Sequence, residues 1–260
     1  MILLGITGAI GHGKSTFAET LHMQEPGMLH LETNMPIIDI ADALQARLIT
    51  ERIEATPAFA HSLLQALPAT IEDLLHRDAA AEDIVPGIDA IINQPQTYAK
   101  LLEYLQLAVD QPGIVGEHIT AANKELYRPL LQWIGAYLIE RIDPLIWIAE
   151  VIERARDYEA SGGPLAVIGG IRSNVEAQVV QEGQGKVILI KRPGIQEPDL
   201  ADPTERHRAH ITPDATVINN GAVTDLLDVA QRVLDDLRLG QLKTEYDALG
   251  GPGKANVSTN

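Results

Sequence analysis

A glycine-rich segment near the amino terminus constrains the fold of this chain more than any other feature. An apolar run, ILLGI at 2–6, precedes GAIGHGKS at 8–15, and the residues that follow have apolar side chains at helical spacing. The segment fits the pattern G-x-x-x-x-G-K-[ST], in which glycines let backbone N–H groups turn inward around a phosphate. The start of the next helix adds the positive end of its dipole. The sequence therefore predicts a strand, a phosphate-binding loop and a helix.

Two other interpretations of this segment are a plain glycine turn and a dinucleotide-binding loop. The glycines at 8, 11 and 13 do not form G-x-G-x-x-G, which disfavours the dinucleotide loop. We therefore expect a nucleoside triphosphate site, with Lys14 reaching the β- and γ-phosphates and the Ser15 hydroxyl binding Mg²⁺. The residues expected to bind the nucleotide are Gly8, Gly11, His12, Gly13, Lys14, Ser15 and Thr16.

Short apolar runs alternate with helical patterns along the rest of the chain. The runs are PIIDI at 36–40, LAVIGG at 165–170, KVILI at 186–190 and ATVINN at 215–220. This alternation predicts an α/β fold with a doubly wound parallel sheet of about five strands. The expected organisation is a single domain over 1–248, with a core at 1–55 and 145–240, a helical insertion at 56–144, a lid at about 192–213 and a disordered tail at 249–260.

The overall charge limits the classes of partner. The 36 acidic and 20 basic residues give a formal net charge of −16, which argues against a nucleic-acid backbone but allows a small phosphorylated ligand. The chain has no cysteine, so disulfides and thiolate metal sites are excluded. No run has the length of a membrane span or the pattern of a signal peptide. We expect a soluble cytoplasmic protein without a membrane partner, and leave a homodimer open.

A second anion-binding position is predicted within 128–141. Arg128, Gln132 and Gly135 share a helix face by their spacing, and Arg141 follows on the same stretch. An arginine fork with an amide beside it can hold a phosphate and the edge of a base. A solvated Arg and Gln on an amphipathic helix are equally compatible with the spacing.

Further arginines follow the predicted strands. Arg172 comes after the third strand, where ligands of parallel sheets bind, and would neutralise charge on a phosphoryl group. An ion pair with Glu176 is the alternative, and both roles can hold together. Arg192, Arg206 and Arg208 flank or occupy the predicted lid, and one or two of them could reach the phosphates when it closes.

Five blocks of the chain, in this order, resemble the deoxynucleoside monophosphate kinases of bacteriophages, which are relatives of the adenylate-kinase-like P-loop kinases. The blocks are the loop at 8–15, IADAL at 40–44, LLQWIGAYLIERIDPLIWI at 130–148, VIGGIRSNVEAQVVQEGQGKVILIKRP at 167–193 and DATVINNGAVTDL at 214–226.

This resemblance implies transfer of the ATP γ-phosphoryl group to a (deoxy)nucleoside monophosphate, with ATP and Mg²⁺ as cofactors. It implies catalytic roles for Lys14, Arg128 and Arg172, and nucleotide binding by Arg192. Acceptor binding is expected of Asp39, Asp42, Arg128, Gln132, Arg141, Arg172 and Glu176. The alternatives are a P-loop kinase for another small acceptor, such as a modified-base nucleotide or dephospho-coenzyme A, and a nucleotide-binding regulatory switch.

The chain departs from the family pattern at two positions. Gly170 stands where the family usually has an acid, and Gln45 stands where a lysine often follows the ADxL block. The missing acid bears on how Mg²⁺ is held. Asp39, at the end of the predicted second strand, is expected to assist Ser15 at the metal; a carboxylate at a helix N-terminus is an equally compatible role.

Overall fold

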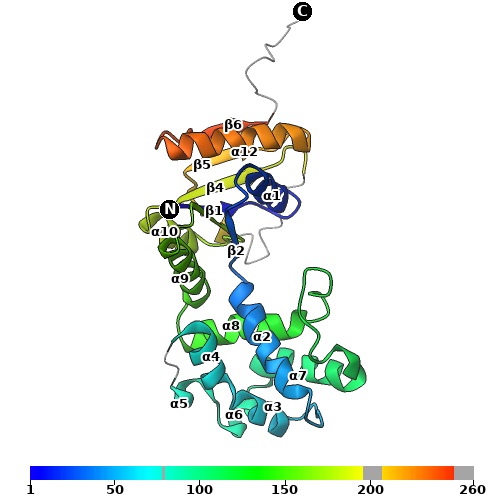
Figure 1. The fold of residues 1–260 in the computed structure, drawn as a ribbon. Coiled ribbons are helices and arrows are strands. Elements are labelled where there is room, and N and C mark those ends of the chain that lie inside the picture. The colour runs from blue at the N-terminus through cyan, green and yellow to red at the C-terminus, as the bar shows by residue number, and fades with distance from the viewer. Residues whose placement is uncertain (78–79, 196–206, 249–260) are drawn as a thin grey trace, which may run out of the picture. The chain divides into compact units, whose positions relative to one another are not determined.

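An open, all-parallel sheet forms the centre of one part of the molecule (Figure 1). The computed structural model describes residues 1–77, 80–195 and 207–248. Six strands lie in the order β2-β3-β1-β4-β5-β6, which confirms the α/β class. Their bounds are Ile2–Thr7 (β1), Leu29–Glu32 (β2), Leu165–Gly169 (β3), Lys186–Lys191 (β4), Ala215–Ile218 (β5) and Glu245–Asp247 (β6).

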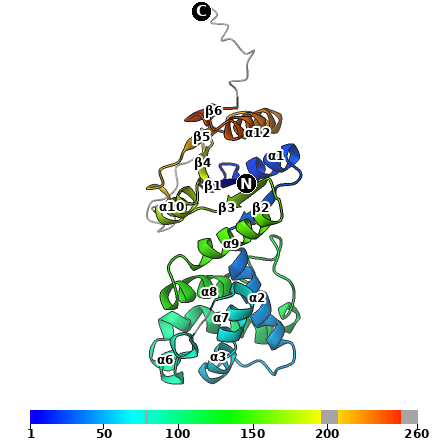
Figure 2. The same cartoon turned by 60° about the vertical axis from the view of Figure 1, so that its left-hand side comes forward.

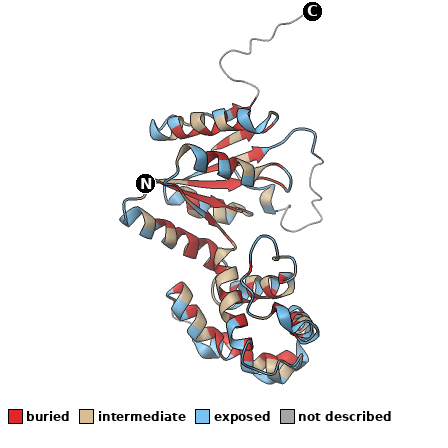
Figure 3. Ribbon diagram, turned by 45° about the vertical axis from the view of Figure 1, so that its right-hand side comes forward, coloured by how far each residue is buried: buried red, intermediate tan, exposed pale blue. Residues whose placement is uncertain are grey.

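The two faces of the sheet are covered by different helices (Figure 2). Helices α1 (Lys14–Gln24) and α12 (Val223–Arg238) pack against each other, and their apolar side chains join Leu4 and Ile6 of β1 in one core. Helix α10 (Asn174–Glu182) lies on the other face, where a Cβ on Gly5 would touch Val180. The strands are therefore buried on both sides, as their apolar sequences predict (Figure 3).

A second compact unit is entirely helical and covers Asn34–Glu150, whereas the sheet unit comprises Met1–Thr33 and Val151–Asn260. The helical unit has its own apolar core, in which the Trp133 ring stacks on Tyr137 with ring centroids 4.8 Å apart. Helix α9 (Ile146–Ala160) leads from the helical unit into the sheet unit. The helices of this unit are α2 (Met35–Leu48), α3 (Pro57–Leu64), α4 (Leu67–Leu75), α5 (Ala81–Ile84), α6 (Ile88–Asn93), α7 (Pro95–Asp110) and α8 (Arg128–Arg141), with a 3₁₀ turn at Pro112–Ile114.

The prediction of a strand at 36–40 is wrong, because this segment lies inside α2. Pro36 is in the first turn of that helix, where its fixed φ and missing N–H are tolerated. Buried residues at 36, 40, 41, 44 and 48 then follow helical spacing. The actual second strand is the preceding segment Leu29–Glu32, and a sixth strand, β6, was not predicted. Helix α2 thus belongs to the helical unit, whereas the sequence had placed residues 1–55 in the core.

Two predicted segments, the tail and the lid, fall wholly or in part outside the described residues. The predicted tail at 249–260 and much of the predicted lid, residues 196–206, lie outside the described residues. Among the helices of the described segments, none combines the length and the apolar character needed to cross a membrane.

A half-buried carboxylate joins three elements at the start of β5. The Asp214 carboxylate accepts hydrogen bonds from Gln181 Nε2, the Val187 N–H and Lys186 Nζ, each at 2.9 Å. Burial alone would raise the pKa of Asp214, but these donors outweigh it and hold the pKa below its usual 3.8. The charged form is therefore preferred in the folded protein.

We expect this carboxylate to make stability depend on acid pH. Its contribution is fully present above the usual pKa and is lost as the pH falls through the lower pKa of the folded state. Asp214→Asn should lower the free energy of unfolding at neutral pH and flatten its decline below about pH 4. Urea unfolding followed by circular dichroism between pH 2.5 and 7 measures this. Asp228→Asn, on the exposed side of α12, is the control, and an equal flattening in that variant would contradict the assignment.

Candidate functional site

The loop between β1 and α1 has a backbone that requires glycine. Gly8, Gly11 and Gly13 have φ angles of 146°, 82° and 95°, a region that side chains disfavour. A Cβ on Gly8 would lie 2.4 Å from the Ile190 carbonyl oxygen, and one on Gly13 would lie 2.3 Å from Nδ2 of Asn219. Nothing lies within 4 Å of a Cβ on Gly11, so there only the φ angle selects glycine. The glycines at 8 and 13 are needed for conformation and for space.

The neighbouring strands β4 and β5 hold this loop in place. Asn219, which directly follows β5, donates from Nδ2 to the His12 carbonyl at 2.9 Å and from its backbone N–H to the Lys191 carbonyl at 2.8 Å. The His12 ring is buried, with Nδ1 3.3 Å from the Ile190 carbonyl. The His12 side chain therefore packs against the sheet at the base of the loop. The sequence analysis missed Asn219, whose one signal is its position after an apolar run.

The start of α1 presents polar groups from the loop. Lys14 is the first residue of the helix, and its Nζ donates to the Ala9 carbonyl at 2.8 Å. Ser15 is exposed and Thr16 is half-buried. The first turn contains no acidic residue, so no carboxylate there offsets the positive end of the helix dipole. This part of the loop therefore favours binding of an anion that carries a cation, because it presents the Lys14 ammonium, the helix terminus and the Ser15 hydroxyl.

Arg172 lies at the same edge of the sheet as the loop. The Ile171 N–H donates to the Ile6 carbonyl at 3.3 Å, and Thr7 Oγ1 donates to the Ile171 carbonyl at 2.8 Å, so the segment after β3 runs beside the end of β1. The Arg172 side chain is exposed, and its guanidinium makes no ion pair in the part of the chain that the structure describes. A cation is therefore available at the carboxyl ends of the strands.

Glu176 has a different role from the predicted ion pair. Its carboxylate accepts the backbone N–H groups of Arg172 at 2.6 Å and Ser173 at 2.9 Å, while its own N–H donates to the Ser173 hydroxyl at 3.2 Å. These bonds form a capping box at the start of α10. Glu176 thus fixes the backbone that carries Arg172. Arg192 is exposed just after β4, Arg208 is half-buried, and Arg206 lies outside the described residues.

An acidic side chain lies over the glycines that end β3. A Cβ on Gly169 would lie 2.1 Å from Glu32 Oε1, and one on Gly170 would lie 3.0 Å from Glu32 Oε2. Glu32 is the last residue of β2, and its Oε1 is 3.3 Å from His30 Nε2. The sequence analysis did not identify Glu32, because it placed the second strand seven residues too late. It put Asp39 at that strand end, whereas Asp39 lies within α2 of the helical unit.

The predicted acceptor residues Arg128, Gln132 and Arg141 all lie on α8. Arg128 and Gln132 are exposed, and Arg128 pairs with Glu125 at 3.2 Å. Gly135, one further turn along, lies close enough to α2 that a Cβ there would be 3.3 Å from Ile37 Cδ1. Arg141 lies over the ring of Tyr137, with Cζ 5.5 Å from its centroid. The segment 128–141 is therefore a regular helix, on which Arg128 and Gln132 are exposed and Gly135 lies against α2.

Asp42 and Gln45 of α2 have partners within the helical unit. The Asp42 carboxylate accepts the Ile119 N–H at 3.1 Å and lies 2.5 Å from His118 Nδ1. Gln45 is fully buried, and its Oε1 accepts the Tyr104 hydroxyl at 3.1 Å. Burial raises the pKa of Tyr104, and charges at neighbouring Tyr127 and Asp42 raise it further, so this hydroxyl remains a donor. A neutral amide at 45 suits this buried position better than a lysine would.

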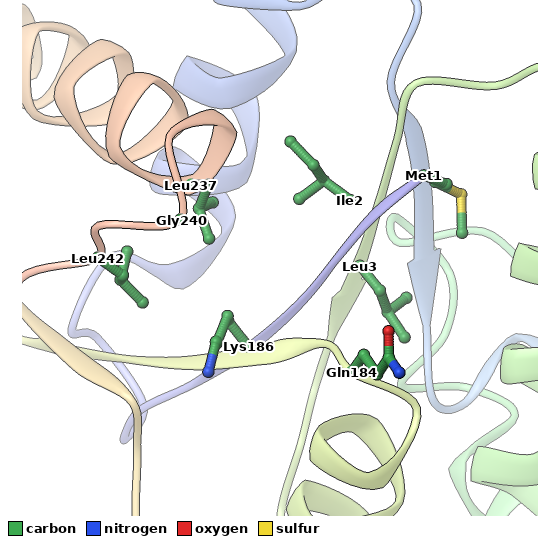
Figure 4. Close-up of a pocket in the computed structure, with 8 residues that line it drawn as sticks. All are labelled: Met1, Ile2, Leu3, Gln184, Lys186, Leu237, Gly240 and Leu242. Carbon is green, nitrogen blue, oxygen red and sulfur yellow. The ribbon is translucent and has the colours of Figure 1, made fainter.

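A hollow of about 360 Å³ opens at the opposite edge of the sheet (Figure 4). Its lining includes Ile2, Lys186 and Leu242, and the first two begin β1 and β4. Ligands of open parallel sheets bind outside the carboxyl ends of the strands. Since this hollow lies at the amino ends, we assign it no part in the candidate site.

The predicted site residues are divided between the two units. The sheet unit carries the glycine-rich loop, Arg172 and Arg192, whereas the helical unit carries Asp39, Asp42, Arg128, Gln132 and Arg141. Among the residues that the structure describes, no group of three or more His, Asp or Glu side chains is arranged to hold a metal ion. Magnesium does not require such a group, because it commonly binds one or two carboxylates together with waters and substrate phosphates.

Comparisons with known proteins assign no family to the chain. No family model matches it, and a search of curated proteins gives no match. The strand order is informative by itself: β1 lies between β3 and β4, and β2 is at the edge. In the usual dinucleotide-binding order, 3-2-1-4-5-6, the first strand lies beside the second. The fold and the loop therefore define an α/β protein with a glycine-rich loop at the carboxyl end of its first strand.

Proposed function

We propose that this protein is a P-loop kinase that transfers the γ-phosphoryl group of ATP to a nucleoside 5′-monophosphate, either ribo- or deoxyribo-. The observation that carries the proposal is the loop at 8–15. It joins a central parallel strand to a helix, needs glycine at two crowded positions, and ends in Lys14 and Ser15 at the helix start. Backbone N–H groups in such a loop bind the β- and γ-phosphates of a triphosphate.

The proposed reaction requires little covalent chemistry from the protein. An oxygen of the acceptor phosphate attacks the γ-phosphorus, the bond to the β,γ-bridging oxygen breaks, and ADP leaves with the electron pair. The acceptor phosphate is already ionised, so no general base is needed. Lys14 and Arg172 would offset the charge that develops on the transferring group, and the acceptor must be held in line. Mg²⁺, when bound to the triphosphate, would supply further charge neutralisation, with the Ser15 hydroxyl as a ligand.

Arg128 and Gln132 are proposed to hold the acceptor. Both are exposed on α8, one helical turn apart, so a guanidinium and an amide can contact one ligand. The Arg128–Glu125 pair is a surface contact of small energy and would yield to a phosphate. This assignment also follows from the resemblance to the phage kinases, in which the corresponding block belongs to the acceptor side.

The direct test is whether ATP consumption depends on an added monophosphate. A panel of ribo- and deoxynucleoside monophosphates, modified pyrimidine nucleotides and dephospho-coenzyme A is assayed for ADP release. Stimulation by one or more nucleoside monophosphates supports the proposal and identifies the base. Stimulation by dephospho-coenzyme A alone would favour the kinase for another acceptor. Slow hydrolysis that no acceptor stimulates would favour a regulatory switch.

We expect Arg128→Ala to weaken the use of the acceptor without weakening that of ATP. Loss of a charged hydrogen bond should raise the acceptor KM about 10- to 100-fold. The KM for ATP should change by less than about twofold, because the loop at 8–15 is untouched. Initial-rate kinetics with each substrate varied in turn separate the two constants. Arg52→Ala, an exposed arginine of the same unit, is the matched control. An equal loss of ATP affinity would refute the acceptor role of α8.

A further inference from the structure

The acid that the phage-kinase pattern places after the third strand is absent, yet a carboxylate occupies that region. Glu32 reaches from β2 across the end of β3, where glycines at 169 and 170 leave room for it. The strand ends are tied together there, since the Thr33 N–H donates to the Gly169 carbonyl at 3.2 Å and Thr33 Oγ1 donates to the Gly170 carbonyl at 3.0 Å. The backbone that carries Glu32 is therefore held in place by the sheet.

The Glu32 side chain lies on the same face of the sheet as α1. Leu165 and Val167 of β3 pack in one core with Phe17 of α1. Side chains alternate along a strand, so position 169 points to this same face. Glu32 pairs in register with Gly169, and its carboxylate covers that residue. Neighbouring strands are about 4.8 Å apart, and β3 is next to β1, so the carboxylate lies about one strand spacing from the strand that leads into the loop.

We propose that Glu32 supplies the carboxylate that assists Mg²⁺ at the triphosphate, from β2 instead of from β3. The inference rests on the proposed function. Mg²⁺ prefers oxygen ligands. The carboxyl ends of the strands offer two such ligands, the exposed Ser15 hydroxyl and the half-buried Glu32 carboxylate. Because Mg²⁺ keeps several of its waters, Glu32 acts by accepting hydrogen bonds from metal-bound water or by replacing one water. Gly169, Gly170 and Glu32 are thus parts of one arrangement, in which the two glycines leave space for the carboxylate.

His30 provides a further argument for this role. It lies two residues before Glu32 on the same strand face, and its Nε2 contacts the Glu32 carboxylate. Both side chains are about 40% exposed, at 38% and 41%, so the pair is accessible to solvent. Such a pair contributes little to stability. Losing the contact with His30 therefore costs little free energy when Glu32 turns toward a bound cation.

The test separates binding of the nucleotide from binding of the metal. Equilibrium binding of ATP to the full chain is measured by calorimetry without metal and at increasing Mg²⁺. In parallel, the affinity of Mn²⁺ for the protein–ATP complex is measured by electron paramagnetic resonance. For Glu32→Gln we expect metal-free ATP binding within about threefold of wild type. The metal affinity of the complex should fall about 10- to 100-fold. Glu182→Gln, an exposed acid at the end of α10, is the control and should leave both unchanged.

A variant that moves the carboxylate from β2 to β3 tests whether the loss of metal affinity is due to the missing carboxylate and not to a disrupted fold. Gly169, unlike Gly170 at φ 77°, lies outside the left-handed region, so it can accept a side chain once the Glu32 carboxylate is removed. Glu32→Ala combined with Gly169→Asp should recover at least about tenfold in metal affinity over Glu32→Ala alone. Unchanged metal affinity in Glu32→Gln, with ATP still bound, would overturn the role of Glu32 only. Wild-type protein that binds no ATP would overturn the proposed function with it.

Discussion

Lys14→Ala is expected to abolish phosphoryl transfer while the protein remains folded. Lys14 is the first residue of α1, and its ammonium donates to the Ala9 carbonyl within the loop at 2.8 Å. In the proposed mechanism it moves to the phosphates and offsets charge on the transferring group. Removing one such group costs about 10²- to 10³-fold in kcat. We expect a loss of at least this size in acceptor-dependent ADP release.

The fold should tolerate this change, because Lys14 is not part of an apolar core. Thermal unfolding followed by circular dichroism should give a Tm within a few degrees of wild type, about what a change below 1 kcal/mol produces. Lys100→Ala, an exposed lysine on α7, is the matched control for loss of a positive charge. Turnover of Lys14→Ala within a few-fold of wild type would exclude the loop at 8–15 as the triphosphate site.

Local patterns were sufficient to predict the beginning of the fold. The apolar run at 2–6 is too short for a helix, and the glycines and Lys14 that follow mark a turn into a helix. The structure has β1 at Ile2–Thr7 and α1 at Lys14–Gln24, as these patterns require. The runs at 165–170, 186–190 and 215–220 were also located correctly, because each is short, apolar and bounded by glycine or polar residues.

The second strand could not be found in the same way. LHLE at 29–32 has only four residues and two polar side chains, whereas PIIDI at 36–40 is more apolar. The apolar residues of PIIDI face the core of the helical unit, so burial against other helices selects the helical conformation. A short apolar run does not distinguish these outcomes. β6 was missed for a related reason, since three residues carry too little pattern.

The parts of the candidate site that the sequence did not predict depend on which strands are neighbours. Asn219 supports the loop because β5 follows β4 in the sheet, and Glu32 covers Gly169 because β2 lies beside β3. These pairs are separated by more than a hundred residues along the chain. Spacing within one helix, by contrast, was enough to predict that Arg128 and Gln132 lie one turn apart on α8; their acceptor role stays a prediction. The kinase activity and the acceptor remain predictions for the experiments described above.

Gly13→Ala is expected to remove most nucleotide binding, through two separable effects. Gly13 has a φ of 95°, and a non-glycine residue held there costs about 1–3 kcal/mol. Its new Cβ would also lie 2.3 Å from Nδ2 of Asn219, a buried side chain that holds the His12 carbonyl. The loop must then shift, and the N–H groups that would surround the phosphates lose their alignment. We expect ATP affinity to fall about 100-fold or more, since 1.4 kcal/mol corresponds to tenfold.

A double-mutant cycle with Asn219→Ala distinguishes the two effects. Asn219→Ala alone loses the bond to the His12 carbonyl and should weaken ATP binding about tenfold, as expected for one buried hydrogen bond. In the double variant the steric conflict is absent, but the strain at φ 95° remains. Its loss of affinity should therefore be smaller than the sum of the two single losses and still exceed that of Asn219→Ala. Strict additivity would mean that Gly13 and Asn219 do not constrain each other. Wild-type ATP affinity in Gly13→Ala would show that the loop does not hold the nucleotide.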